Sequence, residues 1–172
     1  MEYFDLYNEE GFPLRKVATR NQTLGKHEYF LVVHVWIENE NSEFLIQKRA
    51  KKTDPIPHQW AITSGIPNTN ELPLDAAIRE TKEELGITLD RKQLKKRARI
   101  VSNHNQYNTI THVYHTYEAI DLDRLNIDKK EVMDTKYADL DTILKMVEEK
   151  TFWDYRMLLG DKTYFDMLRG RA

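Results

Sequence analysis

The sequence predicts one α+β domain in which a mixed β-sheet is covered by helices. Its 172 residues fit a single domain better than two, and 40% apolar with 31% charged residues is ordinary globular composition. Strand-like segments occur both before and after the helical ones, and no internal repeat or break in composition divides the chain. Such an order of segments is typical of a sheet with helices packed on it.

Composition excludes several classes of function. The chain has 26 basic and 28 acidic residues, a formal charge of −2, which disfavours a protein that coats nucleic acid. It has no cysteine, so disulfides, cysteine–zinc sites, iron–sulfur clusters and thiolate catalysis are excluded. The longest nearly apolar run, residues 30–37, is too short to span a bilayer, and the acidic N-terminus lacks the apolar segment of a secretory signal. We therefore expect a cytoplasmic protein without a membrane partner.

The first half of the chain reads as strands joined by turns. Residues 1–20 predict a hairpin around the turn sequence NEEG, and residues 28–38 are rich in β-branched and aromatic types, as in a buried strand. Residues 43–50 follow an NENS turn and predict the hairpin partner of that strand. Two prolines make residues 51–59 a loop, and residues 60–64 are a short strand.

The second half adds helices. Pro73 in a first turn and Gly86 as the terminating residue predict a helix over residues 73–85. Residues 98–118 contain further strand-like sequence. An amphipathic helix is expected over residues 139–149, with Asp139 or Asp141 as its cap, and the aromatic C-terminal segment predicts one or two helices packed on the body.

The helix over residues 73–85 has its acids in an unfavourable place. Glu80, Glu83 and Glu84 lie on one stripe, because residues three and four apart are neighbours on a helix. Repulsion between them costs about 0.2–0.5 kcal/mol per pair, and the helix dipole disfavours acids in the C-terminal half. A solvated face is the ordinary interpretation of such a charge run. A divalent cation would reverse the sign of both costs, because it needs several carboxylate oxygens at one point.

The spacing upstream decides between these interpretations. From Gly65 the chain has five residues, Glu71, seven residues, Arg79–Glu80, and then Glu83–Glu84, Leu85, Gly86 and Ile87. This resembles the Nudix box, G-x5-E-x7-R-E-U-x-E-E-x-G-U, where U is a bulky aliphatic residue. All seven fixed positions match, which chance would give in roughly one random chain per million. Thr81 stands where the family prefers an aliphatic residue; we expect its methyl to pack and its hydroxyl to bond back to the helix.

The resemblance implies a fold and an activity. The fold would be a Nudix-type α/β/α sandwich with a mixed sheet, formed by residues 1–172 as one domain with residues 1–24 as an N-terminal hairpin extension and the box at residues 65–87. The activity would be that of a MutT-like pyrophosphohydrolase, which uses Mg²⁺ or Mn²⁺ to cleave a nucleoside diphosphate derivative or a similar organic diphosphate.

The resemblance also implies roles for individual residues. Glu80, Glu83 and Glu84 resemble the metal ligands, joined by the Gly65 carbonyl. Arg79 and Glu71 resemble the pair that ties the helix to its preceding loop and orients the ligands. Arg49, at the end of a strand, is the preferred phosphate contact. The proton acceptor stays open among Glu83, Glu84 and a carboxylate from another loop, with Glu118 and Glu131 as candidates.

Most of the chain resembles the Nudix branch that contains type I isopentenyl-diphosphate isomerase. That isomerase needs a cysteine and two histidines, and the corresponding positions here are Ser64, Ile66 and Phe30. A hydrolase is therefore favoured over an isomerase, and a non-catalytic nucleotide sensor is the third alternative. The N-terminal hairpin and the aromatic C-terminal segment are candidates for a homodimer interface, with a monomer as the alternative.

Overall fold

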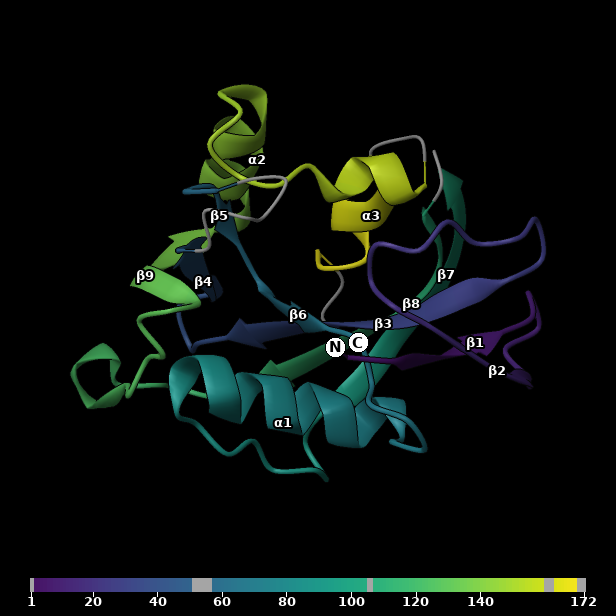
Figure 1. Cartoon of the computed structure of the whole chain (residues 1–172). Helices are drawn as coiled ribbons and strands as arrows, with labels where there is room; N and C mark the ends of the chain where they lie inside the picture. Colours follow the sequence, from purple (N-terminus) through teal and green to yellow (C-terminus); the bar gives the residue numbers. More distant parts are fainter. Residues whose placement is uncertain (1, 51–56, 105–106, 160–162, 170–172) are drawn as a thin grey trace.

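The computed structural model describes residues 2–50, 57–104, 107–159 and 163–169. These residues form one mixed sheet with helices on both faces (Figure 1). The strands are β1 (Phe4–Tyr7), β2 (Pro13–Ala18), β3 (Tyr29–Glu38), β4 (Glu43–Arg49), β5 (Trp60–Ala61), β6 (Thr63–Gly65), β7 (Lys95–His104), β8 (Tyr107–Tyr117) and β9 (Val132–Asp139). The helices are α1 (Pro73–Leu85), α2 (Leu140–Glu148) and α3 (Thr163–Asp166), with 3-10 turns η1 (Leu122–Arg124) and η2 (Tyr155–Leu158).

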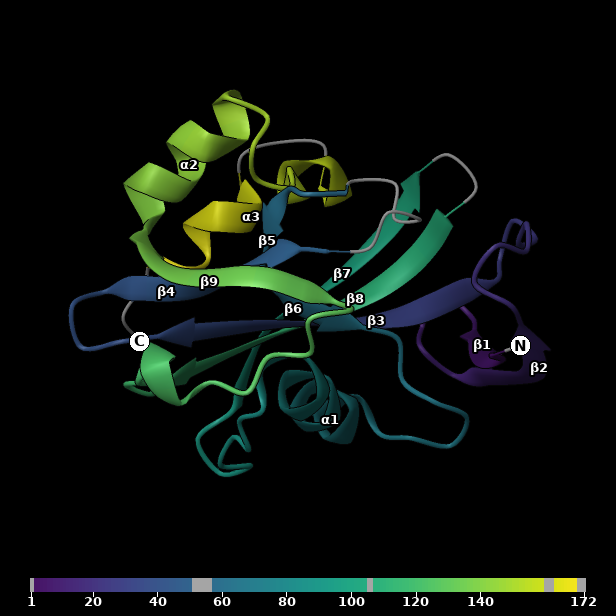
Figure 2. The same ribbon diagram turned by 60° about the vertical axis from the view of Figure 1, so that its left-hand side comes forward.

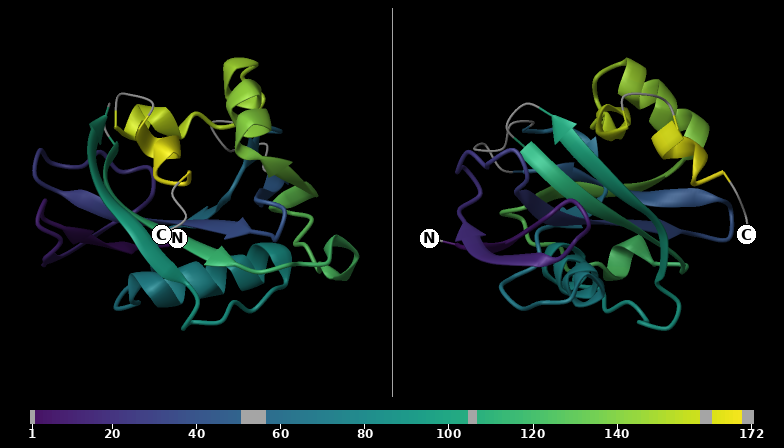
Figure 3. Two further views of the ribbon diagram at one scale, coloured as in Figure 1. Left: turned by 180° about the vertical axis from the view of Figure 1, so that it is seen from behind. Right: turned by 90° about the vertical axis from the view of Figure 1, so that its right-hand side faces the viewer.

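Strand β3 is the centre of the sheet. It pairs antiparallel with β1 and β6 and parallel with β8 over nine residue pairs, which makes the sheet mixed. Strand β7 follows β8 as its antiparallel neighbour, and β4 carries β5 and β9. The N-terminal hairpin β1–β2 extends the same sheet at one end, and α2 and β9 lie near the other (Figure 3).

The two faces of the sheet have separate apolar cores, because successive side chains of a strand point to opposite faces. Val33, Val35 and Ile37 of β3 pack with Ala77 and Leu85 of α1 on one face. On the other face, the core contains side chains from β3, α2, η2, α3 and the segment between α2 and η2, among them Trp36, Ile143, Phe152, Tyr155, Tyr164 and Phe165. Figure 2 shows α1 on one side of the strands and α2 with α3 on the other. The predicted α/β/α arrangement is confirmed.

Both predicted long helices have the expected limits. Helix α1 begins with Pro73, and Gly86 ends it with a positive φ of 74°, its N–H donating to the Lys82 carbonyl. In α2 the Asp139 carboxylate accepts a hydrogen bond from the Thr142 N–H at 2.7 Å, so Asp139 is the cap. The aromatic C-terminal segment supplies η2 and α3, as predicted. No helix in the described part of the chain is long and apolar enough to cross a membrane.

The strands of the first half depart from the prediction in two places. Strands β3 and β4 meet only at Glu38 and Phe44 and then separate, because β6 takes the place beside β3. The predicted strand at residues 60–64 is two strands: β5 pairs with β4, and β6 pairs with β3. Between them the Ile62 N–H donates to the Tyr155 hydroxyl at 3.3 Å. In the predicted loop at residues 51–59, positions 51–56 lie outside the described residues.

Strand β9 has no counterpart among the predicted elements. Its sequence VMDTKYAD is mostly polar, and only Val132 and Ala138 are buried. It is nevertheless paired with β4 over seven residue pairs, from Glu43↔Asp139 to Arg49↔Val132. Backbone pairing with a neighbour, and not an apolar pattern, is therefore what makes this segment a strand.

His34 is buried on the α2–α3 face and hydrogen-bonded to Tyr164. The Trp36 indole N–H donates to the Tyr164 oxygen at 3.0 Å, and the His34 Nδ1 lies 2.8 Å from the same hydroxyl. The hydroxyl proton is thus directed at Nδ1, which requires neutral imidazole with its proton on Nε2. Burial lowers the pKa of His34 to about 3, in agreement with that neutral state.

We predict that His34 makes the protein sensitive to acid. In the unfolded chain the imidazole takes a proton below pH about 6.5, whereas in the folded chain it does so only near pH 3. Its contribution to stability is therefore present above pH 6.5 and is lost as the pH falls through this window. Urea unfolding at pH 7, 6 and 5 should show wild type losing stability faster than His34→Gln, by up to about 1.4 kcal/mol per pH unit. Equal slopes for the two proteins would contradict this.

Candidate active site

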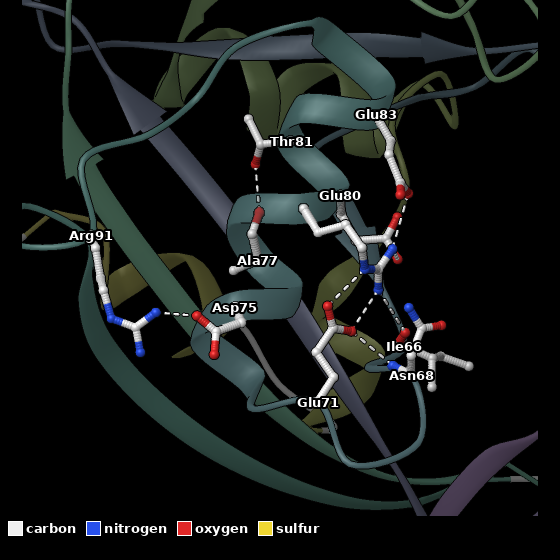
Figure 4. Close-up of polar contacts among 10 residues, drawn as sticks. Ile66, Asn68, Glu71, Asp75, Ala77, Glu80, Thr81, Glu83 and Arg91 are labelled. Atoms are coloured by element: carbon white, nitrogen blue, oxygen red, sulfur yellow. Dashed lines mark hydrogen bonds and ion pairs between the residues drawn. The ribbon is translucent and has the colours of Figure 1, made fainter.

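The Arg79 side chain joins helix α1 to the loop before it. Figure 4 labels its partners Ile66 and Glu71 in the loop and Glu80 and Glu83 on the helix. Its Nε and Nη2 donate to the two carboxylate oxygens of Glu71 at 2.8 and 2.9 Å. Its Nη1 donates to Glu80 and to Glu83, both at 2.9 Å, and Nη2 also donates to the Ile66 carbonyl at 3.3 Å. All five N–H groups of this guanidinium are therefore used within the protein.

The Glu71 carboxylate carries the contact from Arg79 into the loop. The same oxygen that accepts from Arg79 Nη2 accepts a hydrogen bond from the backbone N–H of Asn68 at 2.8 Å. Burial works to raise the pKa of Glu71, but the bonds from Arg79 and Asn68 outweigh it and lower the pKa. Hydrogen bonding to Glu71 likewise raises the pKa of Arg79. Both groups are thus held in their charged forms, as two-donor pairing of a guanidinium and a carboxylate requires.

Gly65 is required by a close approach of Glu80. The loop residue has no side chain, and a Cβ built there would lie 2.2 Å from the Glu80 carboxyl carbon. Any other residue would push the Glu80 carboxylate out of its place, because real Cβ contacts are never so short. The glycine at the start of the box therefore brings the loop backbone against the first glutamate of the helix.

The three glutamates of α1 have different surroundings. The Glu83 side chain is 59% exposed and the Glu80 side chain is 16% exposed. Glu84 is buried, with only 9% of the residue exposed. Burial raises the pKa of Glu80 despite the neighbouring Arg79. Burial also raises the pKa of Glu84 to about 8, against the hydrogen bond that Gln47 Nε2 donates to its Oε2 at 2.7 Å.

A loop distant in sequence caps the end of α1. The backbone N–H of Asn126 donates to the Leu85 carbonyl at 3.2 Å, and that of Asp128 donates to the Glu84 carbonyl at 3.0 Å. The last carbonyls of a helix have no partner within the helix, so these two bonds satisfy groups that would otherwise need water. They also fix Asp128 beside Glu84, and the Glu131 N–H bonds back to the Asp128 carbonyl at 2.9 Å.

These segments surround one cavity of about 260 Å³. It brings the box together with the end of β4, the loop that precedes β9 and the N-terminal hairpin extension. The residues that line it are Glu2, Phe4, Arg20, Arg49, Ser64, Gly65, Ile66, Asn68, Arg79, Glu80, Glu83, Glu84, Asp128 and Glu131.

The structure places most of the predicted site residues at this cavity. Gly65, Arg79 and the three glutamates of α1 line it together with Arg49, and Glu71 lies behind Arg79. Of the two outside carboxylates, Glu131 lines the cavity. Glu118 does not: it follows β8, where its N–H donates to the Glu38 carbonyl and its carboxyl faces the charge of Asp90.

The sequence did not identify two residues that line the cavity. Asp128 and Arg20 line the cavity but lie in polar segments whose composition carries no sign of it. Among the described residues, moreover, no three acidic or histidine side chains converge closely enough to form a ready-made metal site. The reason is visible in the contacts: Glu80 and Glu83 are bonded to Arg79, and Glu84 is bonded to Gln47.

The NUDIX domain model matches residues 28–159. The chain belongs to the NUDIX domain family. An uncharacterized Nudix hydrolase of Listeria innocua is 44% identical over 91 residues, which are 52% of this chain and 54% of that protein. The chain thus spans about half the length of this curated relative.

Solved structures share the fold. The MutT protein of Methanosarcina mazei has a TM-score of 0.63 at 22% identity, over 82% of this chain and 91% of that one. A bifunctional NMN adenylyltransferase/ADP ribose pyrophosphatase of Francisella tularensis, complexed with AMP and a Mn ion, has a TM-score of 0.58 at 25% identity. The latter match covers 77% of this chain and 40% of that one. This Nudix chain therefore has a MutT-like fold over most of its length.

We predict that Glu84 destabilises the protein when no cation is present. Its pKa is about 8 in the folded state and about 4.5 in the unfolded state, so folding favours the protonated acid. Stability is therefore lost as the pH rises from 4.5 through 8. Glu84→Gln keeps the size and an acceptor for Gln47 but does not titrate. In EDTA at pH 8 it should be more stable than wild type, by up to about 1.4 kcal/mol for each pH unit above 4.5.

Urea unfolding at pH 5 and pH 8 measures this difference. Glu83→Gln is the matched control, because it removes one carboxylate from an exposed position on the same helix. If Glu84→Gln is less stable than wild type at pH 8, the prediction is wrong, because the buried charge of Glu84 then costs no stability.

Proposed function

We propose that this Nudix chain is a hydrolase that uses Mg²⁺ or Mn²⁺ to cleave the diphosphate linkage of a nucleoside diphosphate derivative. The observation that carries the proposal is that Gly65, Glu80, Glu83 and Glu84 line the same cavity as Arg49. The family match and the Nudix hydrolase relative support the reaction class. The Francisella tularensis neighbour, with its AMP and Mn ion, supports the choice of ligand and metal.

The residues present fit a divalent cation. Mg²⁺ and Mn²⁺ prefer hard oxygen ligands, and carboxylate and carbonyl oxygens are what this part of the cavity offers. The buried Glu84 carboxyl, with its raised pKa, is a group that a nearby positive charge would stabilise in its ionised form. Glu80, Glu83 and Glu84 would hold the ion with the Gly65 carbonyl. When bound, it neutralises charge on the diphosphate and lowers the pKa of a water molecule.

The chain's own residues then have distinct roles. Arg79 and Glu71 are positioning residues, because the guanidinium is fully hydrogen-bonded and fixes the directions of Glu80 and Glu83. Arg49 lines the cavity beside Glu84 and is the proposed phosphate contact. A guanidinium suits this role because its N–H groups match the spacing of phosphate oxygens.

An isomerase of the isopentenyl-diphosphate type is the second candidate, because the chain resembles that branch. The positions of its cysteine and two histidines are Ser64, Ile66 and Phe30 in this chain. Ser64 and Ile66 line the cavity, whereas Phe30 is buried in an apolar cluster with Phe4 and Leu6. We therefore propose a chain of that branch whose site has the chemistry of a hydrolase. The cytoplasmic location and the homodimer interface stay predictions.

We predict metal-dependent cleavage of at least one compound in a panel of nucleoside diphosphate derivatives that includes ADP-ribose and a diadenosine polyphosphate. Product release should require Mg²⁺ or Mn²⁺, and the same ions should raise the melting temperature. Glu80→Gln should lower kcat at least tenfold and reduce the cation-induced shift, because it removes one proposed ligand. Chromatography of the products and thermal melts with and without EDTA measure both effects.

Asp75→Asn is the matched control for Glu80→Gln. Asp75 is an acid on the same helix, but it is exposed and bonded to Arg91, outside the cavity. It should leave both the activity and the cation-induced shift unchanged. Absence of any product together with absence of a cation-induced shift would overturn the hydrolase proposal. Ligand-induced stabilisation without product would favour the sensor.

Glu131 is the carboxylate outside the box that we propose as the proton acceptor. It lines the cavity close enough to Glu84 to raise the pKa of that group, and the bonds around Asp128 fix its backbone. A general base has to reach the reacting water, and of the two outside candidates only Glu131 is at the cavity.

We predict that Glu131→Gln lowers kcat by about 10²–10³-fold, because positioned general bases contribute in this range. Glu118→Gln should keep wild-type kcat, since Glu118 lies away from the cavity. Steady-state rates on whichever panel compound is cleaved compare the two variants. A Glu131→Gln enzyme that matches the Glu118→Gln enzyme would return the role to Glu83 or Glu84.

A further inference from the structure

Arg20, in the N-terminal hairpin extension (residues 1–24) just after β2, is an exposed cation at the cavity. It lines the same cavity as the three glutamates of α1, and its charge is close enough to lower the pKa of Glu80. Within residues 2–50, 57–104, 107–159 and 163–169, no carboxylate lies within ion-pair distance of its side chain. By contrast, Lys16 of the same hairpin pairs with Glu28 at 2.8 Å.

The guanidinium of Arg20 is supported by an aromatic ring. Its central carbon lies 5.7 Å from the centroid of the Phe4 ring, within the range of a cation–π contact. Phe4 is only 3% exposed and packs edge to face against Phe30. A cation over the face of a fixed ring keeps the N–H groups at its own edge available for an oxygen ligand.

The hairpin that carries Arg20 is fixed relative to the box. Strand β1 pairs with β3 at Leu6 and Phe30, which continues the main sheet. The Asp5 carboxylate also accepts a hydrogen bond from the backbone N–H of Asn70 at 2.9 Å, in the loop that precedes α1. Strand β1 is thus held by its pairing with β3 and by the bond from Asn70, and β2, which leads to Arg20, is paired with β1. These contacts set the distance between Arg20 and the glutamates of α1.

The charges around the cavity favour a further guanidinium to bind an anionic ligand. Its lining contains six carboxylates against three guanidiniums, those of Arg20, Arg49 and Arg79. Arg79 has no N–H left for a ligand, because all five donate to protein oxygens. A diphosphate is itself anionic, so it needs positive charge that the protein has not already used.

We propose that Arg20 binds a phosphate of the diphosphate substrate, which makes the N-terminal hairpin part of the binding site. This inference rests on the proposed function for the class of ligand. Arg20 lies outside residues 28–159, the part matched by the NUDIX domain model. The hairpin thus supplies a substrate contact from sequence beyond the matched domain.

Isothermal titration with methylenediphosphonate in the presence of Mg²⁺ tests this proposal without any turnover. Arg20→Ala should bind this uncleavable diphosphate about tenfold more weakly than wild type, the effect expected for the loss of one charged hydrogen-bond donor. Arg20→Lys should recover part of the affinity, because it restores the charge but not the two parallel donors. Lys16→Ala is the matched control, since it removes one positive charge from the same hairpin, and it should bind within twofold of wild type.

The outcomes separate this proposal from the hydrolase. If Arg20→Ala binds as tightly as Lys16→Ala, the assignment of Arg20 is overturned, whether or not the wild type cleaves the panel. If Arg20→Ala alone loses affinity, the assignment holds even where no compound is cleaved, and only the hydrolase proposal fails. Thermal melts of Arg20→Ala and Lys16→Ala should match wild type, because both side chains are exposed.

Discussion

The geometry of the site depends on the paired hydrogen bonds between Arg79 and Glu71. One edge of the guanidinium holds Glu71, and through Glu71 the backbone of Asn68, while the other N–H groups hold Glu80 and Glu83. The loop and the helix therefore keep their relative position through contacts of the chain alone. The N–H groups of Arg79 are all used within the protein, so the role we propose for this residue is to orient carboxylates. A lysine could not replace it, because a single ammonium cannot give two parallel bonds to one carboxylate.

Placing acids at the C-terminal end of α1 is unfavourable, and the structure shows how the cost is distributed. Arg79 offsets the charge of Glu80 and Glu83, and the N–H groups of the loop at residues 126–128 satisfy the last carbonyls of the helix. The remaining cost falls on Glu84, a buried carboxyl whose pKa is raised to about 8. A buried carboxyl with a raised pKa lowers stability when it is ionised, and proteins break such local rules mainly at functional sites.

The sequence was sufficient for features that depend on neighbouring residues. Pro73 and Gly86 are local signals for the ends of a helix, and the Thr81 hydroxyl bonds back to the Ala77 carbonyl at 2.8 Å, as its place on the helix predicted. Strand β9 could not be predicted, because pairing with β4 and not an apolar pattern defines it. Arg20 and the loop carrying Asp128 escaped for a related reason: their proximity to the box is created by the sheet and by the end of α1. Only tertiary contacts could reveal them.

The change of strand partner at Ile62 links the fold to the chemistry of Glu84. Strand β5 pairs with β4, whereas β6 pairs with β3, and this change of partner places Thr63 beside Gln47. The Thr63 hydroxyl donates to the Gln47 side-chain oxygen at 3.2 Å. With that oxygen occupied, the Gln47 amide is oriented so that its NH₂ group faces Glu84. Glu84 is thus offered a donor at Oε2, which favours the ionised form against the burial that opposes it. The change of strand partner at Ile62, just before the first residue of the box, therefore orients the donor that Gln47 offers to Glu84, a buried acid that lines the cavity.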